Sequence, residues 1–476
     1  MRVRRRVIAA VVFLAIWGLI THGTFAGSGD EAHYLIAAQS LAFDGDFDLA
    51  NNYAMPGNLI GGGTLTPDDH ARPGIGGVLR PAHDVGLPIV FAPYVRIVYP
   101  LAEWLARTLP AALLKRARLD DILIFRHLIS LAMAVIAVAL ALQLFEIFRR
   151  SAASDAAAQC WAMLIALSPP VLSLAFLFFT ELPSALIILW LFRLLSDPDE
   201  RRPPWFLVGA AIGFLLLLHV RNIAAVAALI AWSAVRLSRT RGSSREWTAW
   251  GAALAALLLL RAAIVHAFWG TWLTTPMAVA GDAAMPLSDA VREMFVRTTG
   301  LLFDQEFGLL TYAPIYLLAA PSLLDRRTRE RPGVRPAFLL AAAYGVTVVV
   351  PYINIHGWIG GWSPPARMVM PVVPLLAVPV VAWTRSVRGV RAAVIAAIVS
   401  LQIVIDAVVW QWPKALWNYE DGTSALLESV PALQRMLPAW NGPSVLALRF
   451  VVFLIAWAAM SMLLARRGRD ASAPSQ

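Results

Sequence analysis

Apolar segments separated by polar turns recur along the whole chain. A helix that crosses a bilayer needs roughly 17 to 25 predominantly apolar residues. Segments predicted to cross lie at about 7–26, 121–148, 157–178, 182–196, 204–219, 222–237, 247–268, 307–324, 336–354, 366–384, 390–411 and 445–465. The pattern therefore predicts an all-α, polytopic membrane protein with about 12 transmembrane helices in a single domain, 1–476.

A further apolar stretch, 86–107, begins Gly86-Leu87-Pro88 and is interrupted by more prolines and by charged residues. We expect an interfacial or re-entrant helix here. If this stretch does not cross, every loop on the side of the Arg-rich N-terminus carries arginines, at 149–150, 201–202, 236–245, 326–335, 385–391 and 466–469. This agrees with the positive-inside rule, and counting 86–107 as a span would place those clusters outside.

The outer side then carries a long first loop with interfacial helices, 27–120, and shorter loops at 269–306, 355–365 and 412–444, while 466–476 forms a cytoplasmic tail. All 8 histidines fall in these loops or at the outer ends of helices. A polar outer cavity explains this distribution, and so would a plain preference for arginine in the inner loops. We therefore expect the functional site to lie on the outer side of the membrane.

Composition supports the membrane assignment, because 59% of the residues are hydrophobic and only 15% are charged. A soluble domain could not cover so much apolar surface with so few charges. The net charge of +10 comes from arginine, and in such a chain it reflects topology and not nucleic-acid binding. The single cysteine, Cys160, excludes an intrachain disulfide.

An acidic pair, Asp30 and Glu31, follows the first apolar segment and opens a short helix that the pattern predicts to be amphipathic. The pair suits acid/base chemistry, which requires a positioned carboxylate near an acceptor hydroxyl. Asp30 is the expected base and Glu31 the expected orienting or acceptor-binding group, with His33 and Tyr34 one turn away. Helix capping by Ser28 or Asp30 is the plainer explanation.

Other ionisable residues are expected at the outer helix ends. Glu181, Asp304, Glu306 and His356 are candidate members of the same site, although Glu181 also suits a helix start after Thr180. Arg367, in the expected first turn of a helix, and Arg221 run against the positive-inside bias. A bound phosphate would neutralise the positive charges of these two arginines, and so would pairing with a nearby acidic side chain.

The loop 56–86 contains Asp68-Asp69-His70 and His83-Asp84. Carboxylate and imidazole ligands can hold a divalent cation, but no spacing here is diagnostic, so a metal cofactor remains undecided. The chain contains no phosphate-binding Walker loop, no nucleophile elbow and no HExxH pair.

Several motifs together resemble the GT-C superfamily of polytopic glycosyltransferases, such as protein O-mannosyltransferases, lipid A aminoarabinose transferases and bacterial lipopolysaccharide-core transferases. They are the early Asp-Glu pair, Gly-Leu-Pro before the interfacial helix, the acid before proline at 181–183, Gly-Leu-Leu-Thr-Tyr-Ala-Pro at 308–314 and Gly-Gly-Trp-Ser-Pro-Pro-Ala-Arg at 360–367. The resemblance covers most of the first 385 residues. It departs from the family in using Glu181 in place of an aspartate, and in lacking lysine for phosphate.

The resemblance implies an enzyme that moves a sugar from a polyprenyl-phosphate donor to a glycan, lipid or protein acceptor, by inverting single displacement. It implies that Asp30 is the base and that Arg367 and Arg221 bind the donor phosphate. The expected location is the inner membrane of a bacterium, with cytoplasmic termini and a periplasmic site. A transporter or lipid flippase is the alternative from another class and predicts ionisable residues deep within spans, as at Arg261. A non-catalytic scaffold would not need Asp30 and Glu31 to share a cavity with Arg367.

This topology predicts that residue 30 and the loop 326–335 are accessible from opposite sides of the membrane. A membrane-impermeant thiol reagent should label a cysteine at position 30 in intact cells, and a cysteine in 326–335 only after permeabilisation. Labelling of both positions from the same side would contradict the predicted arrangement.

Overall fold

The computed structural model describes residues 29–54, 65–117, 119–197, 203–273, 285–353, 357–418, 421–428, 430–440 and 448–466. The predicted first span, 7–26, and the candidate site residue His356 lie outside these ranges. The described chain is mainly helical and has only two short strands, which confirms the all-α prediction.

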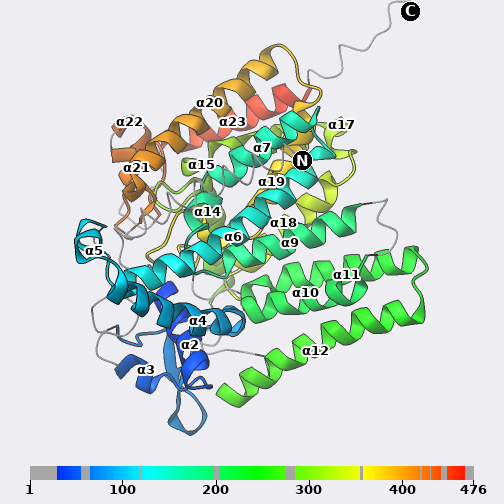
Figure 1. The fold of residues 1–476 in the computed structure, drawn as a ribbon. Coiled ribbons are helices and arrows are strands. Elements are labelled where there is room, and N and C mark those ends of the chain that lie inside the picture. Colours follow the sequence, from blue (N-terminus) through cyan, green and yellow to red (C-terminus); the bar gives the residue numbers. More distant parts are fainter. Residues whose placement is uncertain are drawn as a thin grey trace, which may run out of the picture.

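The longer helices make up most of the molecule (Figure 1). They are α2 (Glu31–Phe43), α4 (Gly86–Thr108), α6 (Asp121–Arg149), α7 (Asp155–Leu167), α9 (Glu181–Ser196), α10 (Trp205–Leu218), α11 (Ile223–Arg239), α12 (Ser244–Trp269), α14 (Leu287–Phe303), α18 (Val334–Val349), α19 (Val373–Thr384), α20 (Val390–Gln411) and α23 (Leu448–Arg466).

Short elements connect them. The short α-helices are α3 (Ala50–Ala54), α5 (Ala111–Ala117), α8 (Val171–Leu174), α15 (Leu309–Tyr312), α16 (Ala319–Leu324), α17 (Arg326–Arg329), α21 (Ala425–Glu428) and α22 (Pro431–Gln434). The 3₁₀ turns are η1 (Ile75–Gly77), η2 (Val220–Asn222), η3 (Pro314–Leu318), η4 (Arg367–Val369) and η5 (Pro413–Leu416), and the strands are β1 (Ala71–Pro73) and β2 (Leu79–Pro81).

Within the described residues, 5 helices are long and apolar enough to cross a membrane: Gly86–Thr108, Asp121–Arg149, Val220–Arg239, Ser244–Trp269 and Val390–Gln411. Shorter apolar helices are Asp155–Leu167, Trp205–Leu218, Pro314–Leu324, Val334–Val349, Val373–Thr384 and Phe450–Ala465. These lengths and compositions are compatible with a membrane location.

Two predicted spans are wrong as single helices, because prolines break them. In 157–178, α7 ends at Leu167 and Pro169-Pro170 follow. In 307–324, Ala313 leaves the helical region and η3 begins at Pro314. Proline lacks the backbone N–H that a continuing helix needs, and its ring clashes with the preceding turn.

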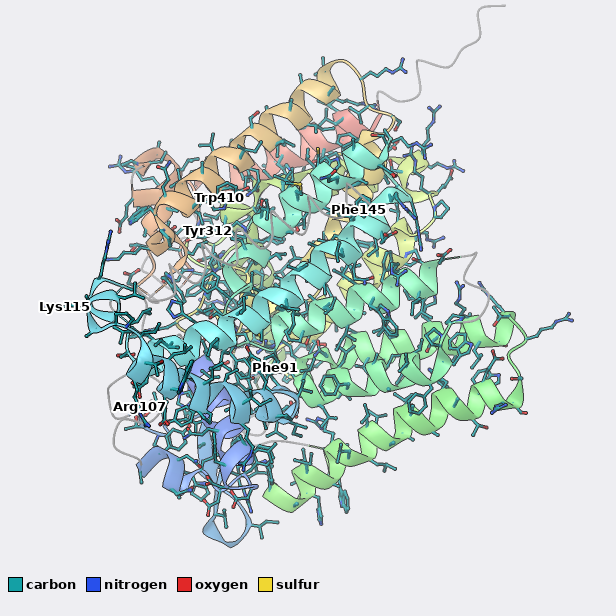
Figure 2. All side chains as sticks on the ribbon, in the orientation of Figure 1. Phe91, Arg107, Lys115, Phe145, Tyr312 and Trp410 are labelled. Atoms are coloured by element: carbon teal, nitrogen blue, oxygen red, sulfur yellow. The ribbon has the colours of Figure 1, made fainter. Side chains whose placement is uncertain are left out.

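The two ends of the helical body are formed by different elements. At one end, a cavity of about 630 Å³ between α6, α9, α18 and α19 is lined by Arg149, Arg150, Arg331 and Arg385. At the other end lie α2, α3, α4 and α5, where Figure 2 labels Arg107 and Lys115. At 1.5 Å per residue, α6 separates these ends by about 40 Å.

Helix α4 lies across the α2 end. The hydroxyl of Tyr94 donates to the carbonyl of Leu128 at 2.8 Å, and the Tyr99 ring packs edge-on against Phe125. Both partners belong to the first turns of α6. The first residue of α4, Gly86, lies so close to the last turn of α10 that a Cβ there would meet the Leu217 carbonyl at 2.4 Å. These contacts hold α4 against the first turns of α6 and the last turn of α10. Its length and composition also suit a membrane span, so the expected interfacial or re-entrant helix stays a prediction.

Three other elements differ from expectation. Helix α2 was expected to be amphipathic, but all of its residues from Glu31 to Ser40 are buried, because α4 covers it. Helix α14 lies within the predicted outer loop 269–306, in its C-terminal half. Strands β1 and β2 form an antiparallel hairpin inside the Gly- and Pro-rich part of the first loop, with Ala71 opposite Pro81. Its turn uses positive φ at Gly76 and Gly77, which glycine adopts at no steric cost.

Candidate functional site

The side chain of Asp30 contacts a residue from the far part of the chain. Oδ2 of Asp30 accepts a hydrogen bond from Nη2 of Arg367, 337 positions away in the sequence. Asp30 occupies the N-cap position of α2 but makes no side-chain capping bond. The preceding Gly29 has a φ of +46° and lies against the Trp362 carbonyl, so a side chain at position 29 would be strained. Capping therefore does not explain Asp30, and its pairing with Arg367 does.

Arg367 is buried among acceptors from several segments. Its Nε donates to Oε1 of Glu181 at 2.9 Å, and its Nη1 donates to the Gly360 carbonyl at 3.1 Å. Its guanidinium carbon lies 4.0 Å from the centre of the Phe179 ring. The expectation that Arg367 sits in the first turn of a long helix is wrong. It begins the three-residue η4, and α19 starts only at Val373, beyond Pro371.

Glu181 joins the two predicted arginines. Its Oε1 also lies 3.3 Å from Nη1 of Arg221, which belongs to η2 between α10 and α11. Thr180 makes no side-chain cap for α9, so the structure gives Glu181 an ion-pairing role. We name the group formed by Asp30, Glu181, Arg221 and Arg367 the acid–arginine cluster. Its two carboxylates and two guanidinium groups sum to zero formal charge.

Two buried polar groups beside this cluster have no hydrogen-bond partner within the described residues: the hydroxyl of Tyr34 and Nε of Arg221. Buried polar groups are nearly always paired with protein or ordered water, so these two groups are available to a water molecule or a ligand. Burial, reinforced by the charges of Asp30 and Glu181, raises the pKa of Tyr34. The Tyr34 hydroxyl therefore keeps its proton and can donate it in a hydrogen bond.

Three histidines pack against Asp30 and form what we name the histidine cluster, His33, His70 and His83. Nδ1 of His70 lies 2.8 Å from Nε2 of His83 and 3.8 Å from Oδ1 of Asp30. The ring of His33 stacks on that of His70 with centroids 3.9 Å apart, and its Nδ1 bonds the Tyr53 hydroxyl at 2.7 Å. Asp30, His70 and His83 are the residues here that could hold a metal ion.

Burial and neighbouring charges shift the pKa values of His33, His83 and Asp30. It lowers the pKa of His33 to about 3 and that of His83 to about 4, so both rings are neutral at neutral pH. Burial alone would raise the pKa of Asp30, but the charge of Arg367, with contributions from His83 and His70, holds it well below its usual range. Asp30 is therefore a permanent carboxylate beside neutral imidazoles.

Glu31 points away from Asp30. Its Oε2 lies 3.4 Å from Nη2 of Arg126 in α6, and its Oε1 accepts from the backbone N–H of Phe178 at 3.0 Å. Both members of the ion pair are only 2% exposed. In this arrangement Glu31 anchors α2 to α6, and the structure does not bring it to the acid–arginine cluster.

Asp304 and Glu306 also lie apart from Asp30. Asp304 accepts from the backbone N–H groups of Glu306, Phe307 and Trp440, and Oε2 of Glu306 accepts from Gly422 N–H at 3.1 Å. These bonds shape a loop whose Phe307 carbonyl accepts from Ala366 N–H at 2.9 Å, next to Arg367. Their effect on the cluster is therefore indirect.

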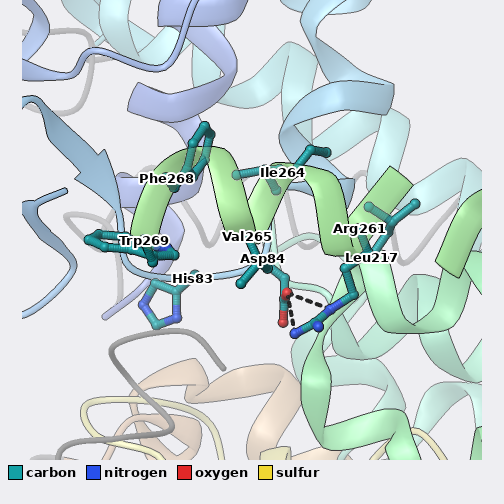
Figure 3. A pocket seen from close by; sticks show the side chains of 9 residues that line it. His83, Asp84, Leu217, Arg261, Ile264, Val265, Phe268 and Trp269 are labelled. Carbon is teal, nitrogen blue, oxygen red and sulfur yellow. Dashed lines mark hydrogen bonds and ion pairs between the residues drawn. The ribbon is translucent and has the colours of Figure 1, made fainter. Parts of the chain in front are cut away.

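A further ion pair links the first loop to α12 (Figure 3). Arg261, which stood out as an ionisable residue deep within a predicted span, contacts Oδ1 of Asp84 through Nη2 at 3.0 Å. Oδ2 of Asp84 accepts from Val220 N–H at 2.7 Å, at the turn that carries Arg221. Asp84 thus holds its neighbour His83 and the turn of Arg221 in one place. The sequence marked Arg261 as needing a partner but contained no signal for which acid.

The chain matches no protein-family model, no curated protein sequence and no solved structure. The resemblance to GT-C glycosyltransferases consequently depends on the motifs quoted above. What the site can do follows from its own geometry: a fixed carboxylate, neutral imidazoles and two arginines at the end of the molecule opposite the arginine-lined cavity.

The anchoring role of Glu31 predicts a large loss of stability on its removal. Breaking a buried ion pair leaves an uncompensated charge and costs about 3–5 kcal/mol, so Glu31→Ala should lower the thermal unfolding midpoint of the purified protein markedly. Glu103→Ala, which removes one member of the exposed Glu103–Arg107 pair, should change stability by less than about 1 kcal/mol. Glu31→Leu combined with Arg126→Met should recover much of the loss. Equal midpoints for Glu31→Ala and Glu103→Ala would refute the anchor.

Proposed function

We propose that the chain is a membrane glycosyltransferase of GT-C type, which moves a sugar from a polyprenyl-phosphate donor to a glycan, lipid or protein acceptor. The observation that carries the proposal is the acid–arginine cluster. Asp30, Glu181, Arg221 and Arg367 come from four separate segments and meet at one end of the helical body. Such a meeting of carboxylates and guanidinium groups, with unpaired donors beside it, suits a reaction that creates a phosphate anion.

In the proposed reaction the acceptor oxygen forms a bond to the anomeric carbon while the bond from that carbon to the phosphate oxygen breaks. The phosphate leaves with the electron pair, and the acceptor proton passes to Asp30. Displacement from the opposite face inverts the anomeric centre. Because the low pKa of Asp30 makes it a weak base, proton transfer should follow bond formation closely and not precede it.

Arg367 and Arg221 have different proposed roles toward the leaving phosphate. Arg367 already donates to Asp30, Glu181 and the Gly360 carbonyl, so its first role is to orient the two carboxylates. Arg221 has a buried Nε without a partner among the described residues, and its side chain is 10% exposed. Arg221, with the Tyr34 hydroxyl, is therefore the better placed first contact for the donor phosphate, and Arg367 adds its charge behind them.

The proposed location is the inner membrane of a bacterium, with the cluster on the outer face. The proposed topology assumes that α4 does not cross the membrane, and the position of α4 across one end of the helical body supports this assumption. The arginine-lined cavity lies at the opposite end, in agreement with the positive-inside rule. The alternative, a transporter or flippase, is weakened because Arg261, its clearest pathway residue, is paired with Asp84.

We predict that Asp30→Asn abolishes sugar transfer while leaving donor affinity nearly unchanged, because the amide still accepts from Arg367 but cannot take the acceptor proton. Transfer is measured with the purified protein in lipid nanodiscs and a radiolabelled polyprenyl-phosphate sugar. Near-normal turnover by Asp30→Asn would refute its role. Deleting the gene and comparing the masses of surface glycans, lipids and glycoproteins identifies the sugar, and unchanged masses would argue against a transferase.

Removing the phosphate contacts should weaken donor binding. A hydrogen bond to a charged group contributes about 1.5–3 kcal/mol, so Arg221→Ala should raise the donor Kd about 10- to 100-fold. Arg367→Lys, which keeps the charge but loses the guanidinium geometry, should lower turnover more than affinity. Binding is measured by titrating polyprenyl phosphate into the protein in nanodiscs, with Arg107→Ala as a control at an exposed site. Unchanged affinity in Arg221→Ala would contradict the assignment.

A further inference from the structure

We propose that Asp30, His70 and His83 form a binding site for a divalent transition-metal ion of the zinc class. Each offers one ligand atom, and the three atoms lie within 4.8 Å of one another. Two imidazole nitrogens and a carboxylate oxygen are a donor set that Zn²⁺ and its neighbours prefer over Mg²⁺ or Ca²⁺.

The spacing fits one ion. Zinc lies about 2.0–2.2 Å from nitrogen and oxygen ligands, so two ligands of one ion are roughly 3–4 Å apart. Nδ1 of His70 is 2.8 Å from Nε2 of His83 and 3.8 Å from Oδ1 of Asp30. Small side-chain rotations therefore bring all three atoms into bonding distance of a single ion.

The fold holds the ligands before any ion binds. The backbone N–H of Ala82 donates to the His70 carbonyl at 2.8 Å, just beyond the open end of the β1–β2 hairpin, and this bond brings His70 and His83 together. His33 stacks on the ring of His70, and Tyr53 fixes His33 in turn. Such neighbours are the usual means by which ligand orientation is set.

Two ion pairs orient Asp30 and the segment that carries His83. Arg367 donates to Oδ2 of Asp30, which leaves Oδ1 to face His70. Next to His83, Asp84 is fixed to α12 by Arg261, as Figure 3 shows. The site is thus supported from the first loop, from α12 and from the loop that carries Arg367.

Charge balance gives a second reason for a cation, and this reason rests on the proposed function. The acid–arginine cluster is neutral in formal charge, and the nearest other charges cancel as the pairs Glu31–Arg126 and Asp84–Arg261. A phosphate anion entering this neutral, half-buried site would lack compensation, and a divalent ion supplies it.

An ion held by three protein ligands keeps an open position for a water or substrate oxygen. Binding of an acceptor hydroxyl there would ease its deprotonation by a weak base. This consequence depends on the proposed transferase function, whereas the binding of the ion itself does not.

Metal binding is tested on the full-length protein in detergent after removal of metals with a chelator. We expect one Zn²⁺ per chain by titration and by elemental analysis, and Co²⁺ should bind with visible absorption bands that indicate nitrogen and oxygen ligands. His70→Ala, His83→Ala and Asp30→Asn should each weaken the affinity at least tenfold. His127→Ala, which removes a histidine whose Nδ1 lies against the Leu123 carbonyl instead, is the matched control and should bind normally.

Absence of stoichiometric binding, or equal affinity in the double variant His70→Ala/His83→Ala and the His127→Ala control, would overturn the proposal and leave the two rings as a plain hydrogen-bonded pair. His70→Gln/His83→Gln, checked for an unchanged elution volume and unfolding midpoint, excludes misfolding as the cause of lost binding. Zinc binding without any sugar transfer would support the metal site and count against the proposed function. Full transfer activity in the chelated protein would support the function and overturn a catalytic ion.

Discussion

The burial of one cation, Arg367, organises the candidate site. Its side chain is 1% exposed, and an isolated guanidinium in such surroundings would be prohibitively costly. It is tolerated because Asp30, Glu181 and the Gly360 carbonyl each accept one of its hydrogen bonds. The start of α2, the start of α9 and the loop before α19 must therefore meet, and each of them positions its carboxylate or carbonyl only while the other two are in place.

The same constraint explains why the site is poised for an anion without containing a free charge. The charged side chains of the acid–arginine cluster pair with one another, and burial keeps His33 and His83 neutral. Fixed, already desolvated groups need no reorganisation when charge develops during a reaction, and this is the usual source of electrostatic catalysis. The unpaired Tyr34 hydroxyl and Arg221 Nε are then the groups that gain most from a ligand.

Much of this arrangement could be predicted from the sequence, because it depends on local signals. Apolar periodicity identified many of the helices. The loop count predicted that Asp30, Glu181, Arg221 and Arg367 share one side, and the structure brings these four residues together. The breaks at Pro169-Pro170 and Pro314 were also local signals, and they were outweighed by the length of the apolar runs. Proline there indicates a broken helix even when hydropathy is continuous.

Pairings could not be predicted in the same way, since partners are far apart in sequence and many acids are available. Asp30 and Glu31 are adjacent, yet one meets Arg367 and the other meets Arg126 on the far side of α2. Successive helical residues point about 100° apart, so two neighbouring acids seldom share one cavity. The histidines are a related case. The sequence named His33 as a candidate site residue and His70 and His83 as possible cation ligands, but only the pairing register of the hairpin brings His70 and His83 together beside Asp30. The site depends on how the two strands of the hairpin pack against α2, and the spacing of residues along the chain does not predict this packing.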